Sequence, residues 1–387
     1  MAMTSRERVQ AVLQHEVPDR VPIIIGVSNT TGIKMKPYRA LKAKLGIQAP
    51  DDYIYDWPEL GTAKVDEQTL QRLHGDARGV LDRFPRAVAE FNRNRDPHTP
   101  AIDDWGGGQI EIEEGVWFPG YHPLAEATTL DDLEKYNGWP IMDDPYRVAQ
   151  AALDAKKLAE ENQYAILATP WLMFPLERAF GLQGMDKFLM NLAMLPDFAE
   201  AMLKKNLELC KQHMGHFLDA VGGNIDMIKI GDDLGTQDRL MISPRMYRKL
   251  LKPIHAELIR FIKERTKAKV FFHTDGDVFD LIGDFIEIGV DILNPVQTSA
   301  GKMADLEGLK REFGRHLVFC GAVDTQYILP NGNPQEVRQE MKRVIGALGK
   351  DGGYMVASVH TIMNEVPAEN ILAMVDAVLD FGTYPLK

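Results

Sequence analysis

The sequence predicts an α/β protein folded as a (β/α)8 TIM barrel with an elaborated N-terminal cap. From about residue 145 onward, amphipathic helical stretches alternate strictly with short apolar runs, a pattern typical of parallel strands covered by helices. A chain of 387 residues is long enough for one such barrel with insertions. No Gly-rich dinucleotide motif or phosphate-binding loop indicates an open nucleotide-binding sheet, so a closed barrel is favoured.

The chain is expected to open with a helix and a strand. Thr4 and Glu7 stand at the spacing of a capping box, and an apolar stripe follows them, which predicts a short amphipathic helix. The run over residues 21–26 is apolar on both faces, as expected for the first strand of a covered parallel sheet.

Residues 29–145 differ in composition from the rest of the chain. They are rich in Gly, Pro, Trp and paired acids, and they contain only scattered helical stretches. We expect a cap or insertion here, with a hairpin around residues 109–118. The whole chain, residues 1–387, is interpreted as a single barrel domain that carries this segment.

The regular alternation follows this segment. Ser243 and Pro244 provide a helix cap and a first helical position, and Asn333 and Pro334 do the same for a later helix. Other helices are expected from about residue 146 and from residue 197 to about residue 221. The predicted strands cover residues 164–169, 227–230, 269–273, 291–294, 317–320 and 354–357.

Composition excludes several classes of protein. The 44 Lys and Arg residues against 56 Asp and Glu residues give a net charge of −12, the wrong sign for binding nucleic acid or anionic membrane surfaces. The chain has only two cysteines, Cys210 and Cys320, which suits a reducing compartment. No apolar leader or membrane-spanning run is seen, so a cytoplasmic protein is expected.

Polar residues follow many of the predicted strands. In a parallel barrel the functional groups stand at the carboxyl ends of the strands, where the loops form the mouth. The candidates at these ends are Thr169, Trp171, Asp232, Asp233, His273, Asp275, Asn294, Gln297, Cys320, Asp324, Ser358 and His360.

His273, Asp275 and His360 are the most specific of these candidates. His273 and Asp275 lie two residues apart at one strand end, and His360 follows the last strand, so all three are expected to face the same cavity. Two imidazoles and a carboxylate are a common ligand set for a catalytic zinc with an open position. The alternative is a hydrogen-bonded polar cluster without a metal.

Asp232, Asp233 and Cys320 have more than one interpretation. The two acids are candidates for a catalytic general base, for a metal ligand or for a helix cap. Cys320 is a candidate metal ligand, although a buried apolar role is common for cysteine.

Several motifs of the second half of the chain occur together and in order. They are PLERAFG at 175–181, DDLGTQ at 232–237, FHTDG at 272–276, GVDILNPVQ at 289–297, GAVDTQ at 321–326 and VPAENI at 366–371. With these motifs the stretch from about residue 172 to the end resembles the uroporphyrinogen decarboxylase superfamily, in particular its corrinoid-dependent methyltransferase (O-demethylase) branch. The resemblance implies the same barrel fold.

The decarboxylases of this superfamily are the poorer match. They carry an arginine-containing loop after the first strand to hold a porphyrinogen with many carboxylates. In this chain the corresponding residues 26–32 read GVSNTTG and contain no arginine. A net charge of −12 also opposes such a polyanionic substrate.

The methyltransferase branch implies a different chemistry. Its thiol-methylating members hold zinc through a His-x-Cys pair and a distant Cys, whereas this chain has His273-x-Asp275 and His360 near the distant position. A nitrogen and oxygen ligand set is a harder Lewis acid than a thiolate set and suits an oxygen-bound methyl group. The implied reaction is zinc-assisted O-demethylation, in which a methoxylated, aromatic small molecule gives its methyl group to a Co(I) corrinoid.

The resemblance also implies partners and substrate-binding residues. The chain lacks the Asp-x-His-x-x-Gly motif that binds a corrinoid, so cobalamin is expected on a small partner protein. Nothing in the sequence decides whether the chain is a homo-oligomer. The residues expected to bind substrate are Trp171, Met173, Phe174, Asn294 and Gln297.

Two alternative functions remain. One is a metal-free decarboxylase or lyase of a small carboxylic acid, in which Asp232 or Asp233 moves the proton. The other is a non-catalytic binding homologue that retains the barrel, which would agree with the altered His-x-Cys pair.

Overall fold

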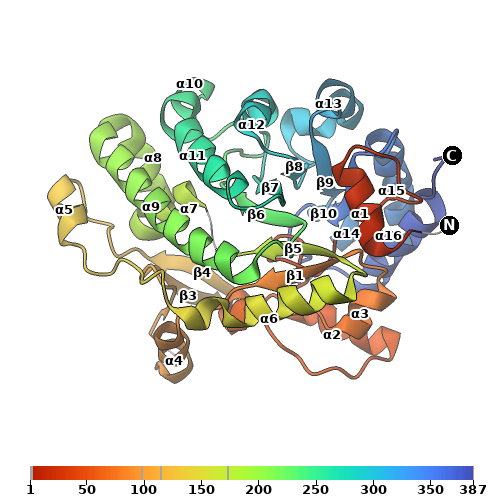
Figure 1. Ribbon diagram of the computed structural model, residues 1–387, viewed down its shortest axis with the longest axis horizontal. Helices are drawn as coiled ribbons and strands as arrows, with labels where there is room; N and C mark the ends of the chain where they lie inside the picture. The colour runs from red at the N-terminus through yellow and green to blue at the C-terminus, as the bar shows by residue number, and fades with distance from the viewer. Residues whose placement is uncertain (1–2, 97–98, 114–115, 172–173, 387) are drawn as a thin grey trace.

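The computed structural model describes residues 3–96, 99–113, 116–171 and 174–386. Its centre is a parallel sheet of seven strands in the order β1, β5, β6, β7, β8, β9 and β10 (Figure 1). The strands are β1 (Ala77–Leu81), β5 (Ala165–Thr169), β6 (Met227–Gly231), β7 (Lys269–His273), β8 (Ile292–Asn294), β9 (Val318–Val323) and β10 (Tyr354–Ser358).

An extended segment over residues 21–25 closes this sheet into a barrel. On one side it pairs in parallel with β10, where the Ile24 N–H donates to the Val356 carbonyl and the Val356 N–H donates to the Pro22 carbonyl, both at 2.8 Å. On the other side the Ile23 carbonyl accepts from the Asp76 N–H at 2.8 Å, just before β1. The segment takes the place of the eighth strand, and the predicted parallel α/β barrel is confirmed.

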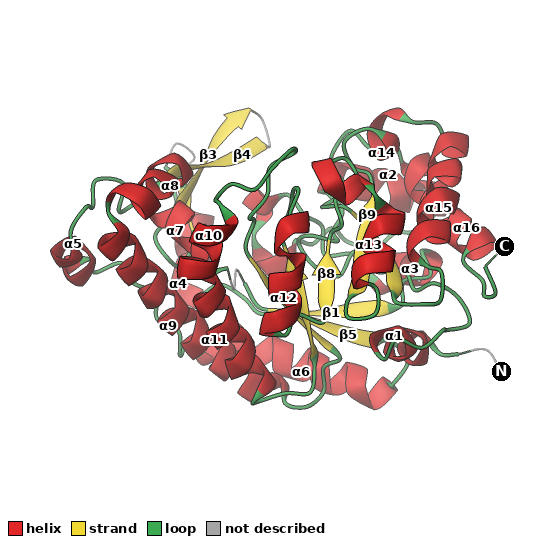
Figure 2. Ribbon diagram, turned by 90° about the horizontal axis from the view of Figure 1, so that it is seen from above, coloured by secondary structure: helices red, strands yellow, loops and turns green. Residues whose placement is uncertain are grey.

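Helices surround the strands on the outside (Figures 1 and 2). The helices that follow the strands in the regular part of the chain are α9 (Pro196–Val221), α11 (Lys252–Lys263), α12 (Ile282–Ile288), α13 (Leu306–Phe313), α15 (Pro334–Leu348) and α16 (Ala368–Phe381). The remaining helices are α1 (Ser5–Leu13), α2 (Met35–Leu45), α3 (Glu67–Arg72), α4 (Arg86–Asn94), α5 (Leu130–Lys135), α6 (Pro145–Glu161), α7 (Pro175–Gln183), α8 (Met185–Met194), α10 (Pro244–Met246) and α14 (Ile328–Asn331). Shorter helical turns lie at Ile54–Asp56, Pro58–Leu60, Phe279–Leu281 and Gly301–Ala304.

The interior of the barrel is a packed apolar core, and α1 closes its amino end. The capping box predicted at Thr4 and Glu7 begins α1. Val9, Val12 and Leu13 of α1 belong to one buried apolar cluster that also contains residues of every strand of the barrel, among them Cys320 of β9. Because this end of the barrel is filled, the opposite, carboxyl end is where a ligand can enter.

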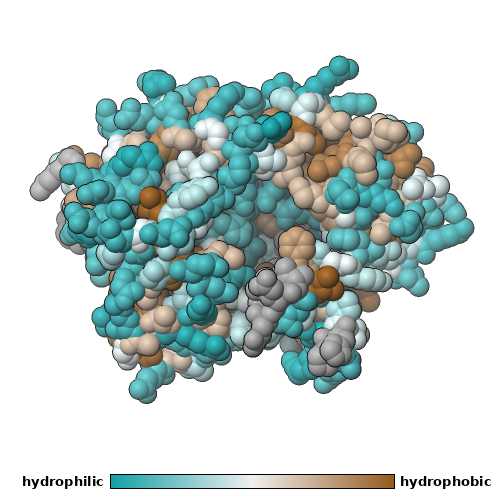
Figure 3. All heavy atoms as spheres, turned by 180° about the vertical axis from the view of Figure 1, so that it is seen from behind, coloured by the Kyte–Doolittle hydropathy of each residue, from teal (hydrophilic) through white to brown (hydrophobic). Residues whose placement is uncertain are grey.

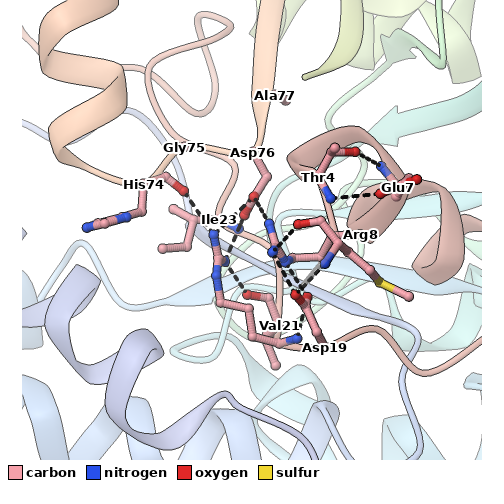
Figure 4. Close-up of polar contacts among 12 residues, drawn as sticks. Thr4, Glu7, Arg8, Asp19, Val21, Ile23, His74, Gly75, Asp76 and Ala77 are labelled. Atoms are coloured by element: carbon pink, nitrogen blue, oxygen red, sulfur yellow. Dashed lines mark hydrogen bonds and ion pairs between the residues drawn. The ribbon is translucent and has the colours of Figure 1, made fainter. Parts of the chain in front are cut away.

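A buried ion network ties α1 to the barrel (Figure 4). The Asp76 side chain is fully buried and accepts from Arg8 at 2.7 Å, from Arg20 at 2.8 Å and from the Ile23 N–H at 2.7 Å. One carboxylate therefore joins α1, the closing segment and β1. A buried charge costs free energy unless it is paired and hydrogen-bonded, and here both conditions are met.

The segment expected as a cap is only in part a cap. Residues 29–145 contain β1, which is a strand of the barrel. Part of this segment therefore belongs to the barrel itself. The sequence signal for β1 is weak because Arg78 and Gly79 break its apolar run. The hairpin expected near residues 109–118 is confirmed as β3 (Gly108–Glu113) and β4 (Val116–Tyr121), which form a small antiparallel sheet with β2 (Ala101–Ile102).

The helix expected from residue 243 onward is divided. After α10 the backbone widens into a π-helical turn at Tyr247–Leu251 before α11 begins. Pro253 explains the change, because it has no N–H for the Lys249 carbonyl and its ring crowds that carbonyl. The described residues contain no helix with the length and apolar character needed to cross a membrane.

Candidate active site

Three metal-capable side chains converge at the mouth of the barrel. His273 ends β7, Asp275 lies two residues further on, and His360 follows β10. One ligand atom from each lies within 4.8 Å of the others. His273 Nε2 is 3.8 Å from Asp275 Oδ2, and His360 Nε2 is 4.0 Å from the same oxygen. We call these three residues the mouth triad.

The donor atoms of the mouth triad are of the types that bind zinc. Tetrahedral zinc bound at about 2.0–2.1 Å keeps its ligand atoms roughly 3.4 Å apart, so the three side chains would approach one another on binding from separations of 3.8 Å to at most 4.8 Å. Asp275 Oδ1 is buried and has no hydrogen-bond partner among the described residues. A bound cation would compensate this orphaned carboxylate oxygen.

Asn294 orients His273 toward the mouth. The Asn294 amide N–H donates to the Cys320 carbonyl at 3.0 Å, which turns its Oδ1 toward His273 Nδ1 at 2.7 Å. His273 Nδ1 therefore carries the proton, and the lone pair of Nε2 faces the triad. Burial, together with Lys229 and His360, holds the pKa of His273 well below its usual value, so the ring is neutral and able to bind a metal.

Glycine brings the loops after β6 and β7 into contact. Gly276 has a φ of +86°, and a Cβ there would lie 2.3 Å from the Gly235 carbonyl carbon. This close approach allows the Asp275 N–H to donate to Asp233 Oδ1 at 2.8 Å. The same Asp233 oxygen lies 3.8 Å from His273 Nε2, so Asp233 stands beside the triad.

The neighbouring acids Asp232 and Asp233 have different roles in the structure. Asp232 is fully buried and accepts from the N–H groups of Leu176 and Glu177 and from His255 Nε2 at 2.8–3.0 Å. It caps the first turn of α7, which is one of the three roles expected for it. Asp233 points to the mouth, and its side chain is 33% exposed.

Cys320 does not join the mouth triad. Its side chain belongs to the apolar core that fills the barrel below the mouth. Burial raises the pKa of its thiol, which disfavours the thiolate that a metal requires. The structure therefore gives Cys320 a packing role in place of the expected metal-ligand role, while its carbonyl fixes Asn294.

A cavity of about 740 Å³ opens beside the triad. It lies between the β3–β4 hairpin and the helices α7 and α8, and Figure 2 shows the hairpin projecting next to α8. Its aromatic lining is Trp57, Phe118, Tyr121, Trp171 and Phe180. Glu177 and Asp233 also line it, so this apolar cavity reaches the acidic side of the mouth.

The expected substrate-binding residues do not all line the same cavity. Trp171 lines the cavity and packs edge-on against Trp57 at 5.2 Å, and Phe174 lies against His273 with ring centroids 6.4 Å apart. Gln297 lines a smaller hollow of about 180 Å³ together with Asp275 and His360. Asn294 is fully buried and acts on His273 instead. Met173 lies outside the described residues.

Two charged residues of the site, Lys229 and Glu177, were not among the candidates predicted from the sequence. Lys229 interrupts the apolar strand β6, and its Nζ donates to Asn29 Oδ1 at 2.8 Å. Burial lowers the pKa of Lys229 to about 7, against the attraction of Glu177, Asp233 and Asp275. Glu177 lies in the first turn of α7, where an acid is common for purely local reasons. A lone charge within a buried strand is the signal that could have identified Lys229.

The carboxyl groups around the mouth carry their protons more tightly than isolated acids do. Burial and the neighbouring Asp233 raise the pKa of Asp275 well above its usual value. Burial, with Asp233 and Asp232, does the same to the pKa of Glu177. Several acids in one partly desolvated site favour either retained protons or a bound cation.

Comparisons with known proteins place the chain in a family. The profile of the uroporphyrinogen decarboxylase (URO-D) family matches residues 119–381. Uroporphyrinogen decarboxylase from Coxiella burnetii (strain RSA 493 / Nine Mile phase I) is 24% identical over 387 residues, which covers 97% of this chain and 94% of that protein. The solved structure of a methyltransferase from Methanosarcina mazei is similar with a TM-score of 0.64 and 21% identity, over 98% of this chain and 99% of that one. The structural likeness concerns the fold alone. Since the family profile matches more than half of the sequence, the chain belongs to the uroporphyrinogen decarboxylase (URO-D) family.

Proposed function

We propose that this chain is a methyltransferase that takes a methyl group from a methoxylated aromatic molecule and gives it to a Co(I) corrinoid carried by a small partner protein. The observation that carries the proposal is that Asp233, whose Oδ1 lies 3.8 Å from His273 Nε2 of the mouth triad, also lines an aromatic cavity of about 740 Å³. The similar protein from Methanosarcina mazei is itself described as a methyltransferase, which agrees with this reaction class.

In this proposal different residues of the chain bind the substrate, hold the metal and orient a metal ligand. Trp57, Trp171 and Phe180 bind the aromatic ring and exclude water from the cavity. His273 and His360, with Asp275, would hold zinc, which would supply Lewis-acid polarisation of an ether oxygen. Asn294 keeps His273 in the tautomer that the metal requires.

The loop after the closing segment argues against a porphyrinogen substrate. Ser28, Thr30 and Thr31 are buried there, and the Ser28 hydroxyl lies 3.3 Å from that of Thr30 and 3.0 Å from that of Thr31. Asn29 Oδ1 accepts a hydrogen bond from the Lys229 ammonium group. No cationic side chain from residues 26–32 is available for a substrate with many carboxylates.

A metal-free decarboxylase or lyase is the second candidate, and one observation favours it. Glu177, Asp233 and Asp275 all have a raised pKa, mainly through burial, so protonated carboxyl groups can move protons without a metal. The Coxiella burnetii relative is described as a decarboxylase. The response to a chelator separates this candidate from the methyltransferase.

The test is a methyl-transfer assay with zinc-loaded protein, a methoxyarene and free cob(I)alamin, followed by the visible spectrum of methylcobalamin. We expect methylcobalamin to form and the reaction to stop after chelation and resume after zinc is added back. His273→Ala and His360→Ala are expected to lower the rate at least about 100-fold, because each removes a ligand.

The matched control is His216→Ala, which removes an exposed histidine on α9 away from the mouth. Its rate should equal that of the unmodified protein. Methylcobalamin formation that survives chelation and both triad substitutions would overturn the role of zinc, absence of methylcobalamin would overturn the proposed function, and decarboxylation after chelation would support the second candidate. A folded protein without any turnover would indicate the non-catalytic homologue.

A further inference from the structure

Glu177 lies between the aromatic cavity and the mouth triad. It lines the cavity together with Asp233 and is half-buried. Its backbone N–H donates to Asp232 at 2.9 Å, which fixes the first turn of α7. Glu177 Oε1 accepts from the Asp233 N–H at 3.2 Å, and within the described part of the chain Oε2 has no hydrogen-bond partner. One oxygen is anchored, and the other remains for a ligand.

The charges that face Glu177 come from several elements. Asp232 and Asp233 follow β6, and Lys229 stands within β6. Burial and the two aspartates raise the pKa of Glu177 well above its usual value, whereas Lys229 lowers it. The effects of the acids and of desolvation exceed that of Lys229, so this carboxyl group holds a proton more tightly than an isolated glutamate does.

We propose that Glu177 is the general acid that protonates the departing oxygen of the methoxyarene, an inference that rests on the proposed function. The bond between the methyl carbon and the ether oxygen breaks, and its electron pair stays on the oxygen. The Co(I) of the partner's corrinoid supplies the electron pair of the new bond to carbon and is oxidised to Co(III). The oxygen takes the proton of Glu177, and solvent returns a proton to the carboxylate when the phenol leaves.

The other nearby acids are less suited to this task. Asp275 belongs to the mouth triad. Asp233 Oδ1 accepts from the Asp275 N–H and lies 3.8 Å from His273 Nε2, which places it against the metal-capable group. Asp232 is fully buried beneath α7. Glu177 and Asp233 both line the cavity, but of the two only Asp233 is hydrogen-bonded to a member of the mouth triad, which leaves Glu177 for the departing oxygen.

The test compares two methoxyarenes in Glu177→Gln, which keeps the side-chain oxygen that accepts from Asp233 but has no acidic proton. One substrate is unactivated and leaves as a basic phenolate. The other carries a nitro group and leaves as a weakly basic nitrophenolate, which needs no proton in the transition state. We expect the rate with the first substrate to fall about 100-fold or more and the rate with the second to fall less than about 10-fold.

A second measurement does not depend on turnover. Infrared difference spectra of the zinc-loaded protein should contain the C=O stretch of a protonated carboxylic acid that is absent in Glu177→Gln. The matched control is Glu307→Gln, an exposed glutamate on α13, which should change neither the band nor the substrate ratio.

The outcomes separate the inference from the proposed function. If the unmodified protein demethylates both substrates and Glu177→Gln slows them equally, or slows neither, Glu177 is not the acid. Absence of the carboxylic acid band in the unmodified protein overturns the inference as well. If the unmodified protein demethylates neither substrate, the proposed function itself fails, and the inference falls with it.

Discussion

At the scale of single residues, the site depends on which neighbour each side chain touches. Asp232 and Asp233 are adjacent in the sequence, yet one caps a helix and the other faces the mouth. A strand-end position identifies both as candidates and cannot distinguish them, because alternate residues leave a strand in opposite directions. The Asn294 contact that fixes His273 is equally invisible in the sequence, since it joins two strand ends.

Asn294 provides a direct test of the metal site. Asn294→Ala removes the acceptor for His273 Nδ1, so the ring loses its fixed orientation and the affinity for zinc should fall about 10- to 100-fold. Competition with a chromophoric chelator measures the dissociation constant. The exposed Asn94→Ala serves as a control that should leave the constant unchanged. An unaltered constant in Asn294→Ala would show that His273 does not bind the metal through Nε2.

The shifted pKa of Lys229 predicts how the free energy of unfolding depends on pH. Burial lowers its pKa in the folded chain to about 7, below the ordinary value of 10.5, so at pH values between these the unfolded chain binds more protons. The free energy of unfolding therefore rises with pH in this window, by up to about 1.4 kcal/mol per pH unit. Lys229→Met lacks this contribution.

Urea unfolding of the metal-free protein from about pH 7 to about pH 9 checks the prediction. The stability of the unmodified chain should increase relative to Lys229→Met as the pH rises. A constant difference between the two proteins over this range would show that the amine retains an ordinary pKa in the folded chain.

At the scale of elements, the barrel is held closed by polar contacts as well as by its core. Asp76 joins α1, the closing segment and β1 through two arginines and one backbone N–H (Figure 4). The sequence predicts seven of the eight barrel strands, because each has an apolar run that at most one internal charge interrupts. It misses β1, whose run contains Arg78 and Gly79, and whose place is fixed by pairing with β5.

Removal of the Asp76 charge should weaken the closure of the barrel. Asp76→Asn leaves Arg8 and Arg20 without their shared anion in a buried position, which should reduce the free energy of unfolding by about 3–5 kcal/mol. Asp131→Asn, which affects an exposed ion pair with Lys135, should cost less than about 1 kcal/mol. Equal, small losses in the two variants would contradict a closing role for Asp76.

At the scale of the whole molecule, polar residues cover most of the face in Figure 3 and surround a hollow near its centre. The net charge of −12 agrees with this surface and disfavours polyanionic partners. The sequence predicts the barrel and the three members of the mouth triad. It cannot predict the aromatic cavity, because its wall combines β4, α7 and α8 with Trp57, which lies far away in the chain.

The central claim is that the mouth triad holds zinc with nitrogen and oxygen ligands. Zinc X-ray absorption spectroscopy of the metal-loaded protein tests it most directly. We expect one shell of nitrogen and oxygen atoms at about 2.0–2.2 Å, with the scattering pattern of two imidazoles and no sulfur. A sulfur neighbour at about 2.3 Å would place Cys320 on the metal. Such a spectrum, or a spectrum unchanged in His273→Ala and His360→Ala, would contradict the account.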